Sequence, residues 1–156
     1  MKILLVGVTD LVGSTSIDVV LSLKEMGHEV DVFNYRTVER QMASVSGIGV
    51  LLEKGLSFLR RCLLPVFLKR FYFWSPARRA MNRLLYQQAI KGYDLVLFFK
   101  TDTLDWLTVK RITSKVDTWY FFMDPPSEAR RIAAHLYAKY ATGASVTFYS
   151  LLDRFK

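Results

Sequence analysis

Short apolar runs alternate with amphipathic stretches along the 156 residues, and this alternation limits the folds that the chain can adopt. Residues 2–7 and 94–99 are almost unbroken aliphatic or aromatic runs, which is typical of strands buried on both faces of a sheet. Strands of this kind occur mainly in parallel sheets that carry helices on both sides. The sequence therefore predicts an α/β fold.

Strands and helices are expected to alternate through a single domain, residues 1–156. The predicted strands are 2–7, 29–35, 94–99, 118–122 and 145–149. The predicted helices are 14–26 with Gly27 as its stop, 102–114 opened by Asp102, and 127–140 stopped by Gly143. This pattern predicts a Rossmann-like three-layer sandwich with a five-stranded parallel sheet in the order 2-1-3-4-5.

A long helical insert, residues 44–91, is predicted between the second and third strands. Ser75 followed by Pro76 is typical of a helix start, so a helix is expected from there to about residue 91. Its core-facing residues are expected to be Ala80, Met81, Leu84, Leu85 and Ala89. Arg78, Arg79 and Arg83 are expected to point outward or obliquely.

The insert also carries the whole charge bias of the chain. The net charge is +8, and residues 50–91 hold nine lysines and arginines against one acid, Glu53. A local field of this kind attracts phosphate, anionic lipid or nucleic acid. An apolar stripe within 48–67 and four aromatics at 71–74 accompany the bases, which favours attachment to an anionic membrane surface. The predicted membrane- or anion-binding residues are Arg60, Arg61, Lys69, Arg70, Trp74, Arg78 and Arg79. Alternatively the stripe packs on the sheet or on a partner, while nucleic acid is an unlikely ligand.

Ligands of open α/β sheets bind beyond the carboxyl ends of the strands, where the strand order reverses. In the predicted order this point lies between the first and third strands. The residues expected to bind a ligand there are Gly7, Thr9, Asp10, Gly13, Lys100, Asp102 and Asp124. Asp124 follows the fourth strand and is the candidate catalytic residue, as a base for a substrate hydroxyl. The alternative role for Asp124 is to cap the helix after Pro126.

Several kinds of chemistry do not fit the sequence. The loop from Gly7 to Gly13 lacks the Gly-x-Gly-x-x-Gly spacing of a dinucleotide site. One cysteine and two histidines leave too few ligands for zinc, so no metal is expected. His28 is interpreted as structural and His135 as a surface residue. The single cysteine indicates a reducing compartment and hence a cytoplasmic location, with the basic insert placing the chain peripherally on the inner face of the membrane.

A set of short motifs, in order along the chain, resembles two-domain GT-B glycosyltransferases, and specifically their spore-maturation (CgeB-like) branch. The opening is carried by Met1-Lys2-Ile3-Leu4-Leu5-Val6-Gly7, Gly27-His28-Glu29-Val30 and Phe33-Asn34-Tyr35-Arg36. The branch is carried by Asn82-Arg83-Leu84-Leu85, Tyr93-Asp94-Leu95-Val96-Leu97, Trp119-Tyr120-Phe121-Phe122-Met123-Asp124-Pro125 and Ser145-Val146-Thr147-Phe148-Tyr149-Ser150. The resemblance spans the whole chain.

This resemblance implies the N-terminal, acceptor-binding domain of an enzyme that transfers a sugar from a nucleotide donor to a sugar or lipid-linked acceptor. In such enzymes a C-terminal domain holds most of the donor, and the chain is expected to lack that half, as a truncated or naturally short domain. No cofactor is therefore expected in this chain, the nucleotide-sugar donor is expected only with the C-terminal domain, and the chain alone is expected to be inactive. The alternative is a non-catalytic Rossmann-like module that docks a partner or membrane through its basic insert.

Overall fold

One parallel sheet organises the structure, a computed structural model that describes residues 1–9, 15–45, 76–100, 103–125, 127 and 134–146. Its strands lie in the order β2-β1-β3-β4-β5, and every neighbouring pair is parallel. The strands are β1 (Lys2–Val6), β2 (Glu29–Phe33), β3 (Leu95–Phe99), β4 (Asp117–Phe122) and β5 (Gly143–Val146). The predicted fold class and strand order are confirmed.

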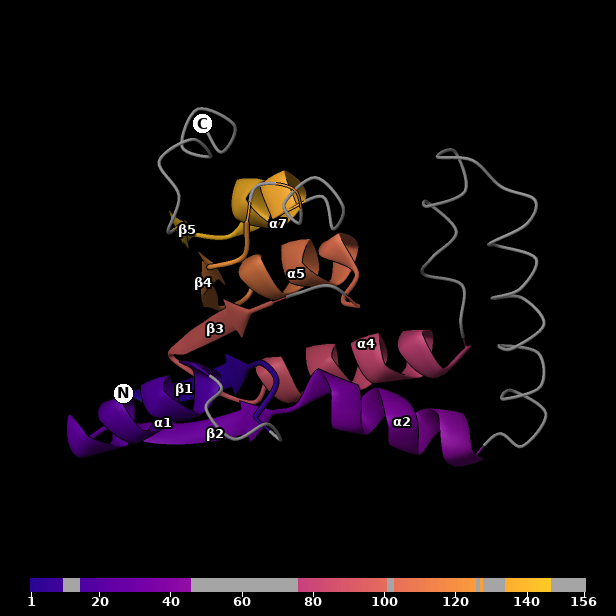
Figure 1. Ribbon diagram of the computed structural model, residues 1–156, viewed down its shortest axis with the longest axis horizontal. Coiled ribbons are helices and arrows are strands. Elements are labelled where there is room, and N and C mark those ends of the chain that lie inside the picture. The colour runs from indigo at the N-terminus through magenta and orange to yellow at the C-terminus, as the bar shows by residue number, and fades with distance from the viewer. Residues whose placement is uncertain (10–14, 46–75, 101–102, 126, 128–133, 147–156) are drawn as a thin grey trace.

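Helices cover both faces of this sheet (Figure 1). They are α1 (Thr15–Glu25), α2 (Tyr35–Val45), α4 (Pro76–Ala89), α5 (Trp106–Thr113) and α7 (Ala134–Tyr140). α1 packs against one face, while α2, α4, α5 and α7 form the layer on the other, which is the arrangement that right-handed crossovers impose on this strand order. Within that layer α2 lies beside α4, α4 beside α5 and α5 beside α7.

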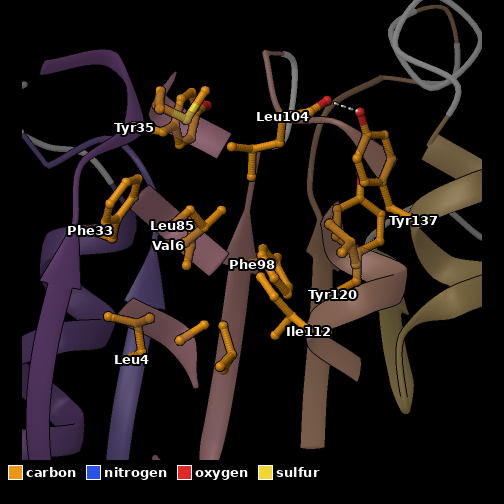
Figure 2. Close-up of a cluster of buried hydrophobic side chains, with 14 of the residues drawn as sticks. Leu4, Val6, Phe33, Tyr35, Leu85, Phe98, Leu104, Ile112, Tyr120 and Tyr137 are labelled. Atoms are coloured by element: carbon orange, nitrogen blue, oxygen red, sulfur yellow. Dashed lines mark hydrogen bonds between the residues drawn. The ribbon is translucent and has the colours of Figure 1, made fainter. Parts of the chain in front are cut away.

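Successive strand residues point to opposite faces, so each central strand feeds two cores. Leu4, Val6 and Phe98 belong to the larger cluster under the four-helix layer (Figure 2), and Ile3 and Leu5 belong to the smaller cluster under α1. Burial on both faces explains why these strands are continuous apolar runs rather than alternating ones.

α4 forms as predicted, with Pro76 as its first residue. Met81, Leu85 and Ala89 are fully buried in the larger cluster, as expected, whereas Leu84 is 38% exposed and was wrongly placed in the core. Arg78, which was expected to point outward or obliquely, is paired within the helical layer. Its Nε lies 2.6 Å from Oε1 of Glu39 on α2, and its side chain is 13% exposed. Arg78 therefore joins two helices, and its role in anion binding stays a prediction.

Two predicted boundaries are wrong because a polar side chain caps a helix at a position that was not expected. β2 ends at Phe33, since Asn34 caps the unpredicted helix α2 by accepting a hydrogen bond from the Thr37 N–H at 3.3 Å. α5 begins after Asp105 rather than at Asp102, because the Asp105 carboxylate accepts from the Leu107 N–H at 3.0 Å.

Gly143 does not stop a helix either, because α7 ends at Tyr140 and Gly143 is the first residue of β5. Its lack of a side chain has a packing reason. A Cβ atom at this position would lie 2.3 Å from a ring carbon of Trp119 on the neighbouring strand. The glycine therefore makes room for the indole.

Gly27 ends α1 as predicted, with φ of +84° and its N–H bonded to the Lys24 carbonyl at 2.9 Å. The His28 N–H continues this cap by donating to the Leu23 carbonyl at 3.1 Å. His135 lies exposed on α7. Five predicted anion-binding residues of the insert lie outside the described residues: Arg60, Arg61, Lys69, Arg70 and Trp74.

Candidate functional site

Polar residues that follow four different strands lie along the carboxyl edge of the sheet, which includes the switch point between β1 and β3. Thr9 follows β1, Asn34 follows β2, Lys100 follows β3 and Asp124 follows β4. We call these four residues the edge cluster. Asp10, Gly13 and Asp102, which were expected to join them, lie outside the described residues.

The loop after β1 begins with a glycine that is buried. The Gly7 N–H donates to the Phe33 carbonyl at 3.2 Å, which ties the loop to β2. A Cβ atom on Gly7 would lie 3.0 Å from the Ser16 hydroxyl oxygen and 3.2 Å from Cβ of Phe99. Gly7 therefore permits the close approach of α1 and β3 and supports the site through packing.

Asn34 connects Thr9 of the edge cluster to the start of α2. Its Nδ2 donates to the Thr9 hydroxyl at 3.4 Å, while its Oδ1 caps α2. The next residue, Tyr35, is completely buried, and its hydroxyl donates to the Lys100 carbonyl. Figure 2 shows Tyr35 at the end of the larger core cluster that lies nearest the carboxyl ends of the strands. The start of α2 thereby holds the end of β3 in place.

Lys100 adopts a backbone conformation that is uncommon for residues other than glycine. Its φ of +49° lies in the left-handed region, which costs roughly 1–2 kcal/mol for an L-residue. The hydrogen bond from Tyr35 helps to stabilise this turn. The side chain then extends toward β4, where Nζ lies 3.0 Å from Oδ1 of Asp124.

The ion pair between Lys100 and Asp124 is partly open to solvent, with side chains 50% and 25% exposed. An ammonium group donates hydrogen bonds and an ionised carboxylate accepts them, so together they match both functions of an alcohol. Asp124 is thus the ion-pair partner of Lys100 among the described residues. The alternative role of Asp124 as a helix cap concerns residues outside the described ranges.

A hollow of about 280 Å³ lies between α2 and the turn after β3. It is lined by Arg36, Glu39, Arg40, Ala43 and Thr103. The Thr103 hydroxyl is buried and has no hydrogen-bond partner among the described residues. Since a buried, unsatisfied hydroxyl destabilises a fold, Thr103 marks a place where a bound polar group would be stabilising.

Sequence reasoning missed Asn34, Tyr35 and Thr103 as residues of this region. An asparagine followed by a polar helix start is a recognisable cap signal and would have identified Asn34. No local signal identifies Tyr35 or Thr103, because their roles depend on groups distant in sequence or on burial.

The described part of the chain contains neither a metal site nor a membrane-spanning helix. No group of three or more histidine, cysteine, aspartate or glutamate side chains comes together there as a metal site. None of the helices in those ranges combines the length and the apolar character needed to cross a bilayer.

No protein-family model, curated protein or solved structure matches this chain. Function is therefore inferred from the chemistry at the carboxyl edge and from the order of motifs in the sequence.

Proposed function

We propose that this chain is the acceptor-binding domain of a nucleotide-sugar-dependent glycosyltransferase. The ordered motifs at residues 1–7, 27–30, 93–97 and 119–125 support the family. The Rossmann-like sheet with its switch point between β1 and β3 is compatible with such a domain. A fold of this type hosts many functions, so the edge cluster has to carry the assignment.

The single observation that carries the proposal is the Lys100–Asp124 pair, whose charged atoms lie 3.0 Å apart and are partly open to solvent, at the same edge of the sheet as Thr9 and Asn34. These groups offer an ammonium, a carboxylate, a hydroxyl and an amide on one edge. A neutral polyol such as a sugar presents several hydroxyls, each both donor and acceptor, and such a mixed set can bind them.

In this proposal Asp124 also receives the proton in the transfer step. The acceptor hydroxyl oxygen forms a bond to the anomeric carbon of the donor, and the bond from that carbon to the nucleoside diphosphate breaks. The hydroxyl proton passes to the Asp124 carboxylate, and Lys100 orients the acceptor. The donor is held by a second domain, as the family resemblance implies.

We further propose that the domain works in the cytoplasm, peripherally on the inner face of the membrane. The support is the concentration of nine bases and one acid within residues 50–91, next to apolar and aromatic residues. Docking of a protein partner by the same insert is the alternative, and vesicle binding separates the two.

Binding of sugars to the full chain tests the site. We expect saturation-transfer NMR with a panel of mono- and disaccharides to find at least one ligand with a Kd of about 10 mM or tighter, a binding free energy of roughly −3 kcal/mol. Lys100→Gln and Asp124→Asn should each weaken that ligand by roughly tenfold, because each removes a charge-assisted hydrogen bond.

Matched controls change the same charges on α1, at Lys24→Gln and Asp18→Asn, where both residues are exposed. These controls should bind as the wild type does. The proposal fails if no saccharide binds, or if the controls weaken binding as much as the changes in the edge cluster.

A further inference from the structure

A second polar hollow, of about 400 Å³, lies between α4 and α5, in the helical layer rather than at the switch point. We call it the α4–α5 groove. Its lining comes from one side of α4, at 79, 82, 83, 86 and 87, and from residues 105, 108 and 111 at the start and along one side of α5. These spacings of three and four residues place each set on one face of its helix.

The floor of the groove is rigidly built. Asn82 is only 7% exposed and accepts a hydrogen bond from the Asp105 N–H at 2.9 Å, while its own amide donates to the Arg78 carbonyl at 2.8 Å. Thr108 is buried beside it. One asparagine therefore connects the two helices and fixes the distance between the walls.

The rim is strongly basic. Arg79, Arg83 and Arg111 line the groove, and Asp105 is the one acid among its lining residues. The Arg111 guanidinium carbon lies 4.3 Å from the centre of the Tyr86 ring, so stacking holds this side chain in a defined position. The Asp105 carboxylate is engaged by the Leu107 N–H at 3.0 Å and only partly offsets the positive charge.

We propose that the α4–α5 groove binds a phosphate-bearing ligand, through Arg83, Arg111 and Arg79. Guanidinium groups bind phosphate oxygens through two parallel hydrogen bonds, and Arg is favoured over Lys where such planar recognition matters. Three guanidinium groups around a hollow of about 400 Å³ can bind a diphosphate or a phosphorylated headgroup. This site is separate from the edge cluster and does not depend on the proposed transferase activity.

Calorimetric titration of the full chain with inorganic pyrophosphate tests the groove. We expect saturable binding that the double variant Arg83→Gln, Arg111→Gln weakens by roughly tenfold or more, because two charge-assisted contacts are lost. The matched control is Lys91→Gln, Lys115→Gln, which removes the same charge from exposed residues outside the groove and should bind as the wild type does.

Asp105→Asn is a variant whose expected effect, tighter binding of pyrophosphate, cannot result from misfolding. Asparagine is an equally good helix cap, so α5 should persist, while loss of the carboxylate should tighten pyrophosphate binding severalfold. In NMR spectra the backbone amide signals of Asp105 and Leu107 should shift during the titration, which locates the ligand at the groove.

Vesicles of phosphatidylcholine with phosphatidic acid distinguish a lipid headgroup from a free phosphate compound. If the Arg83→Gln, Arg111→Gln variant loses pyrophosphate binding and also binds the phosphatidic acid vesicles more weakly than the wild type does, while it binds phosphatidylserine vesicles normally, the ligand is a headgroup. If it loses pyrophosphate binding and binds both kinds of vesicle as the wild type does, the ligand is soluble. The proposal is overturned if the wild type does not bind pyrophosphate, or if the lysine control loses as much affinity as the arginine variant.

Discussion

The edge cluster and the α4–α5 groove are both polar sites on the same sheet-and-helix framework, but their charges are arranged differently. In the edge cluster the Lys100 ammonium has the Asp124 carboxylate 3.0 Å away. In the groove three arginines share the lining with one acid, Asp105. The first arrangement is balanced, whereas the second carries an excess of positive charge.

This difference in charge balance indicates which class of ligand each site can bind. A balanced set of donors and acceptors favours neutral polar molecules, since an added charge would break an existing ion pair. An excess of guanidinium groups favours anions. A test of either site should therefore change charge without changing shape, as the substitutions below do.

The largest expected effect concerns basic residues that belong to neither the edge cluster nor the α4–α5 groove. Changing Arg60, Arg61, Lys69 and Arg70 to Gln should abolish attachment to anionic vesicles, because each base near such a surface contributes about 1 kcal/mol. Cosedimentation should show the wild type on anionic vesicles, scarcely on neutral ones, and released as salt rises.

The control for this prediction is the Arg83→Gln, Arg111→Gln variant on phosphatidylserine vesicles, which should still attach. Should the wild type ignore anionic vesicles at low salt, or the four-Gln variant bind equally well, the insert is a packing or partner-docking element. The basic insert would then not be a membrane-binding surface that can be compared with the two sites.

Tyr35→Phe should have the next largest effect, on the edge cluster alone. Removal of the hydroxyl that bonds the Lys100 carbonyl should lower the free energy of unfolding by about 1 kcal/mol and weaken saccharide binding. Tyr137→Phe is the matched comparison, since that hydroxyl donates to the Leu104 carbonyl at 2.6 Å inside the core. It should destabilise similarly in urea titrations and leave saccharide affinity unchanged; equal affinity loss in both variants would contradict a role in the site.

The Lys100–Asp124 pair itself should contribute little to stability. A double-mutant cycle with Lys100→Gln and Asp124→Asn should give a coupling of about 0.5 kcal/mol, because exposed ion pairs are screened by solvent. A weak coupling together with loss of saccharide binding assigns the pair to ligand recognition. A coupling above roughly 2 kcal/mol would instead make it a structural element.

The smallest expected effect is a pH dependence from the groove. Burial raises the pKa of the Asp105 carboxyl above its ordinary value of 3.8, while the hydrogen bond from the Leu107 N–H acts in the opposite direction. The folded state therefore binds this proton more tightly, and its stabilising contribution, complete below the unfolded pKa, is lost as pH rises through the folded pKa.

Asp105→Asn should remove that dependence, which is expected to be small because the half-buried carboxyl is screened by solvent. Urea titrations from about pH 3 to 7 measure it. The difference in unfolding free energy, variant minus wild type, should increase with pH in the acidic range and then level off. A difference that decreases with pH would contradict the burial of Asp105.

Features that depend on local sequence were predictable. The apolar runs of β1 and β3, the proline that starts α4 and the glycine that ends α1 each act through neighbouring residues. Together with the alternation of elements they were enough to give the strand order.

Features that depend on contacts between distant residues were not predictable from one sequence. Arg78 was expected to point outward or obliquely from its helical position, and its pairing with Glu39 on α2 depends on how the two helices pack. The groove likewise forms only because α4 and α5 pack side by side, which brings arginines of both helices together. Of the edge cluster, Thr9, Lys100 and Asp124 were predicted because they follow strands and Asn34 was missed, while Tyr35 supports the cluster only through a carbonyl 65 residues away.

The hydrogen bond from the Asp105 N–H to Asn82 also bears on motion within the helical layer. That amide proton can exchange with deuterium only when α5 moves away from α4, because its acceptor is on the other helix and is 7% exposed. Its exchange rate therefore measures how often the two helices separate. A ligand that bridges the two helices would slow the exchange of this proton selectively. A single amide resonance would therefore report both how often the helices separate and how far a ligand suppresses that separation.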